Sequence, residues 1–175
     1  MRAPVTHRGS RTAGFTIVEV LVSLVILSIG LLGIAKLVLF SAHANDSAYL
    51  RSQATQLAYE ILDNMRANPT AAAAGNYNTV FSAAATPPGF TCQNAVCTVP
   101  ANLATYDIYR WKLRLAAGAG GGALPSGQGQ VSVNTATAPI MATIIVQWDD
   151  TAAQSVFAPT AATPMSVTLE TMLHP

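Results

Sequence analysis

Charged residues and histidines are scarce in this sequence of 175 residues. Only 10% of the side chains are charged, whereas 51% are hydrophobic, and the three histidines are His7, His43 and His174. None of these histidines is placed to serve a serine or cysteine nucleophile. The carboxylates are few and scattered, so the sequence does not indicate the carboxylates of a glycosidase or the ligands of a metal centre. We therefore expect a protein that is not an enzyme and that holds no cofactor and no metal.

Cysteine is also rare, because Cys92 and Cys97 are the only two. Two cysteines without a nearby histidine cluster cannot supply the four ligands of a structural zinc site. In an exported chain, such a pair within a turn-rich segment is typical of a disulfide, and two unrelated free thiols are the alternative. We predict a disulfide between them, which closes a short loop and shapes it locally.

The net charge gives no support for nucleic-acid binding. Three of the nine basic residues, Arg2, Arg8 and Arg11, come before Phe15. From Phe15 onward the chain has six basic and eight acidic side chains, a net charge of −2. Such a balance does not attract a polyanion, so we do not expect nucleic acid as a partner.

A long apolar run follows the basic residues. From Phe15 to Ala35 there are 21 residues with a single charge, Glu19. As a helix this run rises about 32 Å, the thickness of the hydrocarbon core of a bilayer. The basic residues before it predict that the N-terminal segment stays in the cytoplasm and that the chain after residue 36 is exported. Inserting a carboxylate into hydrocarbon costs about 2.5–3.5 kcal/mol on insertion scales. The presence of Glu19 in this run therefore indicates a functional role.

Two other interpretations of the apolar run stay open. Ala42-His43-Ala44 has the small-x-small pattern of a secretory cleavage site. Against it, the uncharged run from Val20 to Ala35 exceeds the usual apolar core of a signal peptide, and the helical pattern continues past residue 44. A plain membrane anchor is the second interpretation, and it would leave Glu19 without a role.

The start of the apolar run resembles a known processing signal. Gly14-Phe15-Thr16-Ile17-Val18-Glu19, after a short basic leader, is similar to the class III signal of type IV pilins and their relatives. The resemblance implies that a prepilin peptidase cuts between Gly14 and Phe15 and that Phe15 is then methylated. It also implies an assembly salt bridge between Glu19 and the new amino group of Phe15, on a neighbouring subunit.

The helical pattern continues beyond the membrane segment. An apolar stripe recurs at intervals of four and three residues, and it consists of Leu50, Ala54, Leu57, Ile61 and Met65. Pro69 prevents the helix from continuing. We predict one helix over residues 15–67, with its first half in lipid and its second half packed along a globular head. The predicted organisation is a leader at 1–14, a transmembrane or filament-core helix at 15–40, an amphipathic exported helix at 41–68 and a head at 69–175.

The head is predicted to combine loops, one ambiguous segment and three strands. Residues 70–102 are rich in Ala, Thr, Asn and Pro and are predicted to be mostly loop. The periodicity of Leu103–Ala117 fits a strand and a helix equally well. Alternation predicts strands at Gln130–Thr135, Met141–Trp148 and Met165–Met172. Their short connections favour an antiparallel sheet that covers the apolar stripe of the long helix, in an α+β fold.

A narrower resemblance covers residues 103–150. A Trp-bearing segment is followed by Leu124-Pro125-Ser126-Gly127-Gln128-Gly129-Gln130-Val131 and by a strand that ends in Trp148-Asp149. This arrangement looks like that of PilV-type minor pilins, in which the Trp segment is helical, so we predict a helix there. The implied fold is pilin-like, with a long N-terminal helix packed on a small antiparallel sheet.

The function implied by this resemblance is that of a minor pilin, which helps to initiate type IV pili through helix packing and head contacts and serves twitching motility. The implied partners are the prepilin peptidase, the other minor pilins, the major pilin and a tip adhesin. Before assembly the chain would cross the inner membrane once, with its head in the periplasm. It would then join the pilus fibre at the cell surface.

Three alternatives to this function are open. A pseudopilin of a type II secretion system shares the whole N-terminal signal. A DNA-receptor pilin would use a basic contact face formed by Arg110, Lys112 and Arg114, whose default interpretation is a solvated face. An anchored periplasmic enzyme would require that leader cleavage is irrelevant to function.

Overall fold

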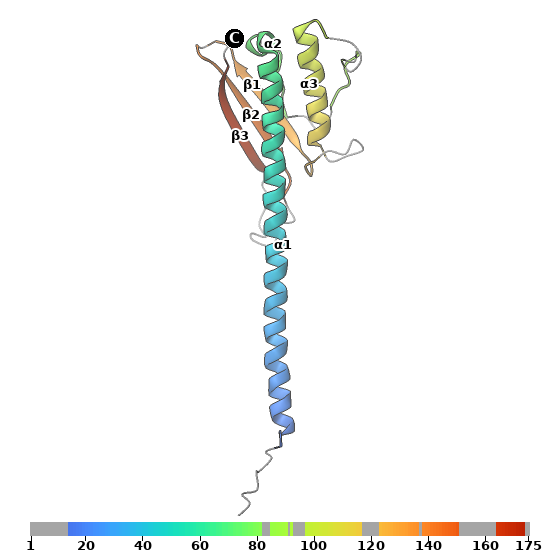
Figure 1. The fold of residues 1–175 in the computed structure, drawn as a ribbon, viewed down its shortest axis with the longest axis vertical. Helices are drawn as coiled ribbons and strands as arrows, with labels where there is room; N and C mark the ends of the chain where they lie inside the picture. The colour runs from blue at the N-terminus through green and yellow to red at the C-terminus, as the bar shows by residue number, and fades with distance from the viewer. Residues whose placement is uncertain are drawn as a thin grey trace, which may run out of the picture. The chain divides into compact units, whose positions relative to one another are not determined.

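The computed structural model describes residues 14–81, 85–90, 92, 97–116, 123–136, 138–150 and 164–173. The elements follow in the order α1 (Ile17–Ala67), α2 (Pro69–Ala73), α3 (Pro100–Leu115), β1 (Gln128–Asn134), β2 (Ile140–Trp148) and β3 (Met165–Leu173) (Figure 1). The chain divides into two compact units, Met1–Ser41 and Ala42–Pro175, which we call the N-terminal unit and the C-terminal unit. The predicted leader before Gly14 lies outside the described residues.

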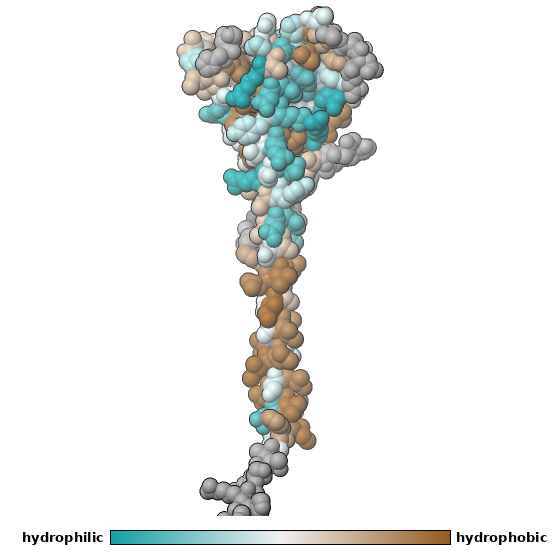
Figure 2. Space-filling model, viewed as in Figure 1, coloured by the Kyte–Doolittle hydropathy of each residue, from teal (hydrophilic) through white to brown (hydrophobic). Residues whose placement is uncertain are grey.

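The N-terminal unit presents its apolar side chains to its surroundings. Every large hydrophobic residue of α1 between Ile17 and Phe40 is exposed. Figure 2 shows hydrophobic side chains along the visible face of this part of the helix. Among the described residues, α1 is the one helix long and apolar enough to cross a membrane. Such exposure is stable only in lipid or against other apolar helices.

The part of α1 within the C-terminal unit is amphipathic, as predicted. Ala54, Leu57, Ile61 and Met65 are buried, and Leu50 packs partly against the same core. The helix ends at Ala67, and Pro69 then begins the short helix α2. The segment predicted to be mostly loop therefore begins with a short helix. A proline that ends one helix suits the first turn of the next, where no N–H partner is needed.

The sheet is antiparallel, with the strand order β1-β2-β3. Ala142, Ile144, Val146 and Trp148 of β2 are buried on one face. The helices α1 and α3 lie over the sheet on the same side (Figure 1). The three predicted strands are confirmed, and β1 begins two residues before the predicted Gln130. A long helix packed against a three-stranded antiparallel sheet confirms the α+β, pilin-like fold.

The ambiguous segment is the helix α3, as the narrower resemblance implied. Ala104, Trp111 and Leu115 are buried, and Ile108 is packed against the core beside them. Pro100 occupies the first turn, so the helix begins three residues before the predicted Leu103. A proline at this position is a start signal that the periodicity of the segment did not include.

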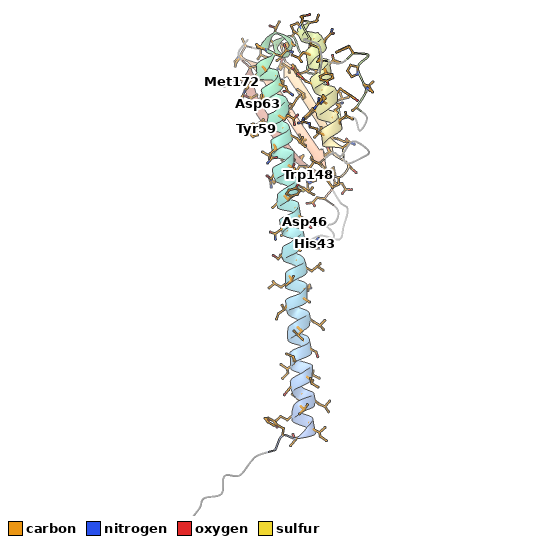
Figure 3. All side chains as sticks on the ribbon, turned by 45° about the vertical axis from the view of Figure 1, so that its right-hand side comes forward. His43, Asp46, Tyr59, Asp63, Trp148 and Met172 are labelled. Carbon is orange, nitrogen blue, oxygen red and sulfur yellow. A yellow bond between two sulfur atoms is a disulfide. The ribbon has the colours of Figure 1, made fainter. Side chains whose placement is uncertain are left out.

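A hydrogen bond joins α1 to the end of β2. Ser47 Oγ donates to Asp150 Oδ2 at 2.6 Å, and Asp150 is buried. Asp150 lies two residues after Trp148, which is seen beside α1 in Figure 3. The buried carboxylate of Asp150 thus accepts a hydrogen bond from α1, as buried polar groups require. This bond holds the chain directly after β2 against the helix.

Candidate functional site

The Gly14–Phe15 junction precedes the first helical residue, Ile17. Phe15 is 83% exposed, and a Cβ added at Gly14 would meet no atom within 4 Å. A peptidase must bind the bond that it cuts in an accessible, non-helical backbone. The junction has both properties in this structure.

Thr16 caps the start of α1. Its Oγ1 accepts a hydrogen bond from the Glu19 N–H at 3.2 Å, and its carbonyl oxygen accepts from the same N–H at 3.1 Å. Thr16-x-x-Glu19 is the spacing of a capping box, and it places the Glu19 carboxylate in the first turn, near the positive end of the helix dipole. The prediction of a helix over residues 15–67 did not include this start signal.

The cap does not by itself explain a carboxylate at Glu19. A charge at a helix N-terminus gains about 0.3–1 kcal/mol, whereas insertion of a carboxylate into hydrocarbon costs about 2.5–3.5 kcal/mol. Within the part of the chain that the structure describes, the ion pairs are Arg66–Asp63 and Arg114–Glu60, and neither involves Glu19. The cost of inserting the Glu19 carboxylate therefore exceeds its gain at the helix N-terminus. A cation outside the described residues would have to supply the difference.

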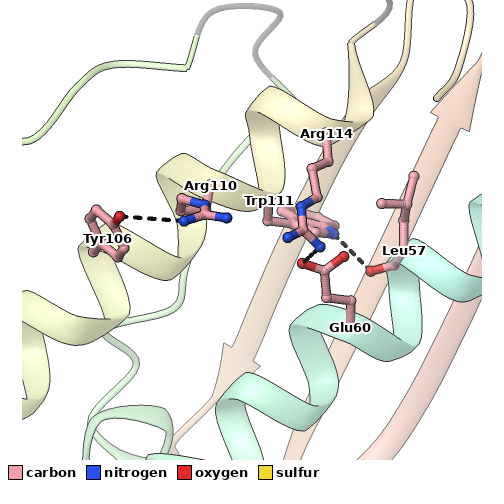
Figure 4. A network of polar contacts seen from close by, with 6 residues as sticks. All are labelled: Leu57, Glu60, Tyr106, Arg110, Trp111 and Arg114. Carbon is pink, nitrogen blue, oxygen red and sulfur yellow. Dashed lines mark hydrogen bonds and ion pairs between the residues drawn. The ribbon is translucent and has the colours of Figure 1, made fainter. Parts of the chain in front are cut away.

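The basic residues of α3 do not form one face. Lys112 is buried, its Nζ donates to the Val80 carbonyl at 3.1 Å, and burial lowers its pKa. Arg114 pairs with Glu60 of α1 at 2.6 Å (Figure 4). Arg110 instead lies over the ring of Tyr106, 5.9 Å from the ring centre. On a helix, residues two apart point about 200° apart, so Lys112 faces away from Arg110 and Arg114. The proposed common face is therefore not formed.

Trp111 anchors α3 on α1. Its Nε1 donates to the Leu57 carbonyl at 2.8 Å, and the side chain is fully buried (Figure 4). A Cβ at Gly129 would overlap the Trp111 ring, and a Cβ at Gly127 would overlap the Leu115 carbonyl oxygen. Both glycines of the Leu-Pro-x-Gly-x-Gly segment therefore let β1 pass directly against α3. The two glycines were part of the resemblance to PilV-type pilins, but this packing reason for them was not predicted.

A buried polar network joins α1, α3 and the turn after α2. The Tyr77 hydroxyl donates to Asp107 Oδ2 at 2.7 Å and lies 3.4 Å from the Asn68 amide nitrogen, which also donates to the Pro100 carbonyl at 2.8 Å. Tyr77 is fully buried, and burial together with Asp107 raises its pKa. Burial also raises the pKa of Asp107, and the hydrogen bond from Tyr77 opposes that rise. No sequence pattern indicated this network.

Asp107→Asn should change how the stability of the C-terminal unit depends on pH. The pKa of Asp107 in the folded state is above its ordinary value of 3.8. The protonated carboxyl therefore stabilises the folded state fully below pH 3.8, and this stabilisation is lost as the pH rises through the folded pKa. Asparagine does not titrate and still offers Tyr77 an acceptor oxygen.

We expect the Tm of the variant, relative to that of the wild type, to rise as pH increases from below 3.8 to neutrality. The rise should be small, because the carboxyl is half-buried and partly screened. Thermal unfolding of the full chain in detergent micelles measures it. A difference in Tm that stays constant over this range would contradict the assignment.

Cys92 and Cys97 form a disulfide, with their Cα atoms 5.5 Å apart. It closes a short loop, as the spacing of the two residues predicted. Within the described residues, no group of three or more His, Cys, Asp or Glu side chains could hold a metal ion.

Two protein-family models match the chain. A model described as a prokaryotic N-terminal methylation motif matches residues 9–35, and one described as type IV pilin Tt1218 matches residues 37–109. No curated protein and no solved structure matches the chain. Residues 37–109 are therefore similar to a type IV pilin family, and residues 9–35 carry the N-terminal methylation motif of a class III signal. This motif implies processing by a prepilin peptidase and assembly with other pilins.

Proposed function

We propose that this chain, which carries a type IV pilin match and the N-terminal methylation motif, is a minor pilin of PilV type. Before assembly it crosses the inner membrane once through α1, with its C-terminal unit in the periplasm. With other minor pilins it then starts a type IV pilus, to which the major pilin is added. The mature chain serves twitching motility as part of the fibre.

The mechanism is packing of processed subunits. The prepilin peptidase cuts between Gly14 and Phe15, and Phe15 is methylated. The new amino group of one subunit pairs with Glu19 of its neighbour in apolar surroundings, where an unmatched charge is costly. The pair therefore favours a subunit inserted at the correct axial step over one that is out of register.

One observation carries this proposal. The helix α1 exposes apolar side chains from Ile17 to Phe40, and the one carboxylate of this stretch, Glu19, lies in the first turn, four residues after the accessible Phe15. A filament core supplies both an apolar environment for the helix and an amine for the carboxylate. Neither a cleaved secretory signal nor a plain anchor accounts for that carboxylate.

Mass spectrometry of the protein purified from its natural cells tests the proposal. We expect the mature chain to begin at Phe15 with one added methyl group. A Gly14→Val variant is the matched control and should retain its leader, because the peptidase then has a branched side chain to accommodate. A functional chain that begins at Asn45, or that keeps its arginine-bearing leader, would overturn the proposal.

The same N-terminal features support a pseudopilin of a type II secretion system as the second candidate. Deletion of the gene separates the two functions. Loss of twitching with normal enzyme secretion supports the minor pilin, and the reverse phenotype supports the pseudopilin.

A further inference from the structure

The two edges of the sheet differ in how their backbone groups are satisfied. At the β1 edge, Thr79 and Val131 exchange N–H···O=C bonds of 2.9 and 3.0 Å, and the Val133 N–H donates to Asn78 Oδ1 at 2.6 Å. The chain itself thus covers this edge. At the other edge, no strand among the described residues pairs with the outer side of β3.

The pairing register identifies the backbone groups at the open edge. Val131 directs its N–H and C=O to Thr79, so it makes no hydrogen bonds to Ile144, the residue opposite it on β2. Because these directions alternate in an antiparallel sheet, the N–H and C=O of Ile144 point to its β3 partner, Leu169. The outward groups of β3 are therefore those of Ser166, Thr168, Glu170 and Met172.

This edge has few of the features that normally protect an edge strand. β3 is nine residues long and contains no proline and no lysine, and its one charge is Glu170. Natural proteins usually guard such edges with charges, prolines, bulges or short strands. A long row of N–H and C=O groups with a single charge can hydrogen-bond to an extended backbone.

A groove lies at the C-terminal end of the same strand. It has a volume of about 410 Å³ and is lined by Met65, Arg66, Pro69, Ala72, Thr171, Met172 and Leu173. Met172 is 56% exposed, and Figure 3 places it on the same flank as Tyr59 and Asp63. The Arg66 side chain is 58% exposed, and its contact to Asp63 is a long one of 3.4 Å. The groove therefore offers an apolar floor and a cation that remains accessible to a carboxylate.

We propose that the open edge of β3 accepts an extended segment of another protein as a fourth strand. An apolar side chain of that segment enters the groove, and an adjacent carboxylate pairs with Arg66. A second copy of this chain fits less well, because its β1 edge is already covered. Full antiparallel pairing of two β3 strands would also place Ser166 of the copy opposite Met172, so no carboxylate would reach Arg66. The proposal does not depend on leader processing.

Peptide binding to the full chain in detergent micelles tests this surface. The probes are two end-blocked peptides of alternating Thr and Val, one with Leu-Glu at its N-terminal end and one with Leu-Glu at its C-terminal end, so that both strand directions are sampled. We expect saturable binding of one peptide by fluorescence anisotropy. Thr168→Pro should weaken it about tenfold, which is 1.4 kcal/mol, because the proline ring removes an outward N–H.

Matched variants make the test specific. Thr168→Val keeps the N–H and the branched shape, so its binding should equal that of the wild type. Arg66→Gln should weaken the Leu-Glu peptide and leave its Leu-Gln counterpart unchanged. Because the Thr168 N–H does not pair with β2, proline should leave the sheet folded. A peptide N-methylated at alternate amides should lose binding to the unaltered protein, which keeps the test valid even if the proline variant unfolds.

Several results would overturn the proposal. These are no saturable binding of either peptide, an equal loss with Thr168→Val, or slow hydrogen exchange of the outward β3 amides in the free chain, which would mean that the chain covers its own edge. Self-association that Thr168→Pro abolishes would make a second copy the occupant instead. Sedimentation of the unliganded chain detects that case.

Discussion

Gly127→Ala is expected to destabilise the C-terminal unit by about 3 kcal/mol, the upper part of the range for overpacking. The added Cβ would overlap the Leu115 carbonyl oxygen and lie 2.8 Å from the Leu115 carbonyl carbon and the Leu124 Cβ. A backbone carbonyl cannot rotate away as a side chain can. The same carbonyl accepts the Leu124 N–H at 3.2 Å, so relief of the clash would break that hydrogen bond as well.

Thermal unfolding of the full chain in detergent micelles measures the effect. A loss of this size should lower the Tm by roughly 10 °C in a unit of this length. Gly89→Ala is the matched control, because a Cβ at that exposed position would meet no atom within 4 Å, and its Tm should be unchanged. Equal Tm values for the two variants would show that the close approach of β1 to α3 is not needed for stability.

Local patterns were enough to predict most of the fold. The stripe from Leu50 to Met65 marked the buried side of α1, and the alternation over Met141–Trp148 predicted the strand β2, because both periods follow directly from backbone geometry. The segment that became α3 satisfied both periods. Its packing decides the outcome, since Trp111 is buried with its Nε1 on the Leu57 carbonyl of α1, a contact 54 residues away.

The parts that could not be predicted depend on contacts between distant residues. Tyr77 and Asp107 lie 30 residues apart, and Ser47 and Asp150 lie 103 residues apart. No periodicity within a segment reports such pairs. The basic residues of α3 show the same limit, because their alternation suggested one face, whereas the helix turns Lys112 into the interior. The Thr16 cap and the helix starts at Pro69 and Pro100 were local signals that were available from the sequence and missed.

Glu19→Ala is expected to preserve leader cleavage and to reduce incorporation into filaments by more than about a hundredfold. Loss of one partner from a buried charge pair costs about 3–5 kcal/mol, and each 1.4 kcal/mol is about tenfold. In the proposed filament core, the substitution would leave the Phe15 amine without a carboxylate partner. It also removes the insertion cost of a carboxylate, so the amount in the membrane should not fall.

Two further variants separate charge from packing in this experiment. Glu19→Gln keeps the side-chain size and should assemble as poorly as Glu19→Ala if the ion pair is what matters. Glu60→Ala removes a carboxylate from a partly exposed ion pair, which is worth at most about 1 kcal/mol, so its incorporation should stay near the wild-type level. The readout is the amount of each variant in sheared fibres relative to its amount in the membrane. Normal incorporation of Glu19→Gln would mean that the side chain acts by shape and not by charge. The Thr16 cap would then be its main partner, and the register of assembly would have to be set by the apolar surface of α1 alone.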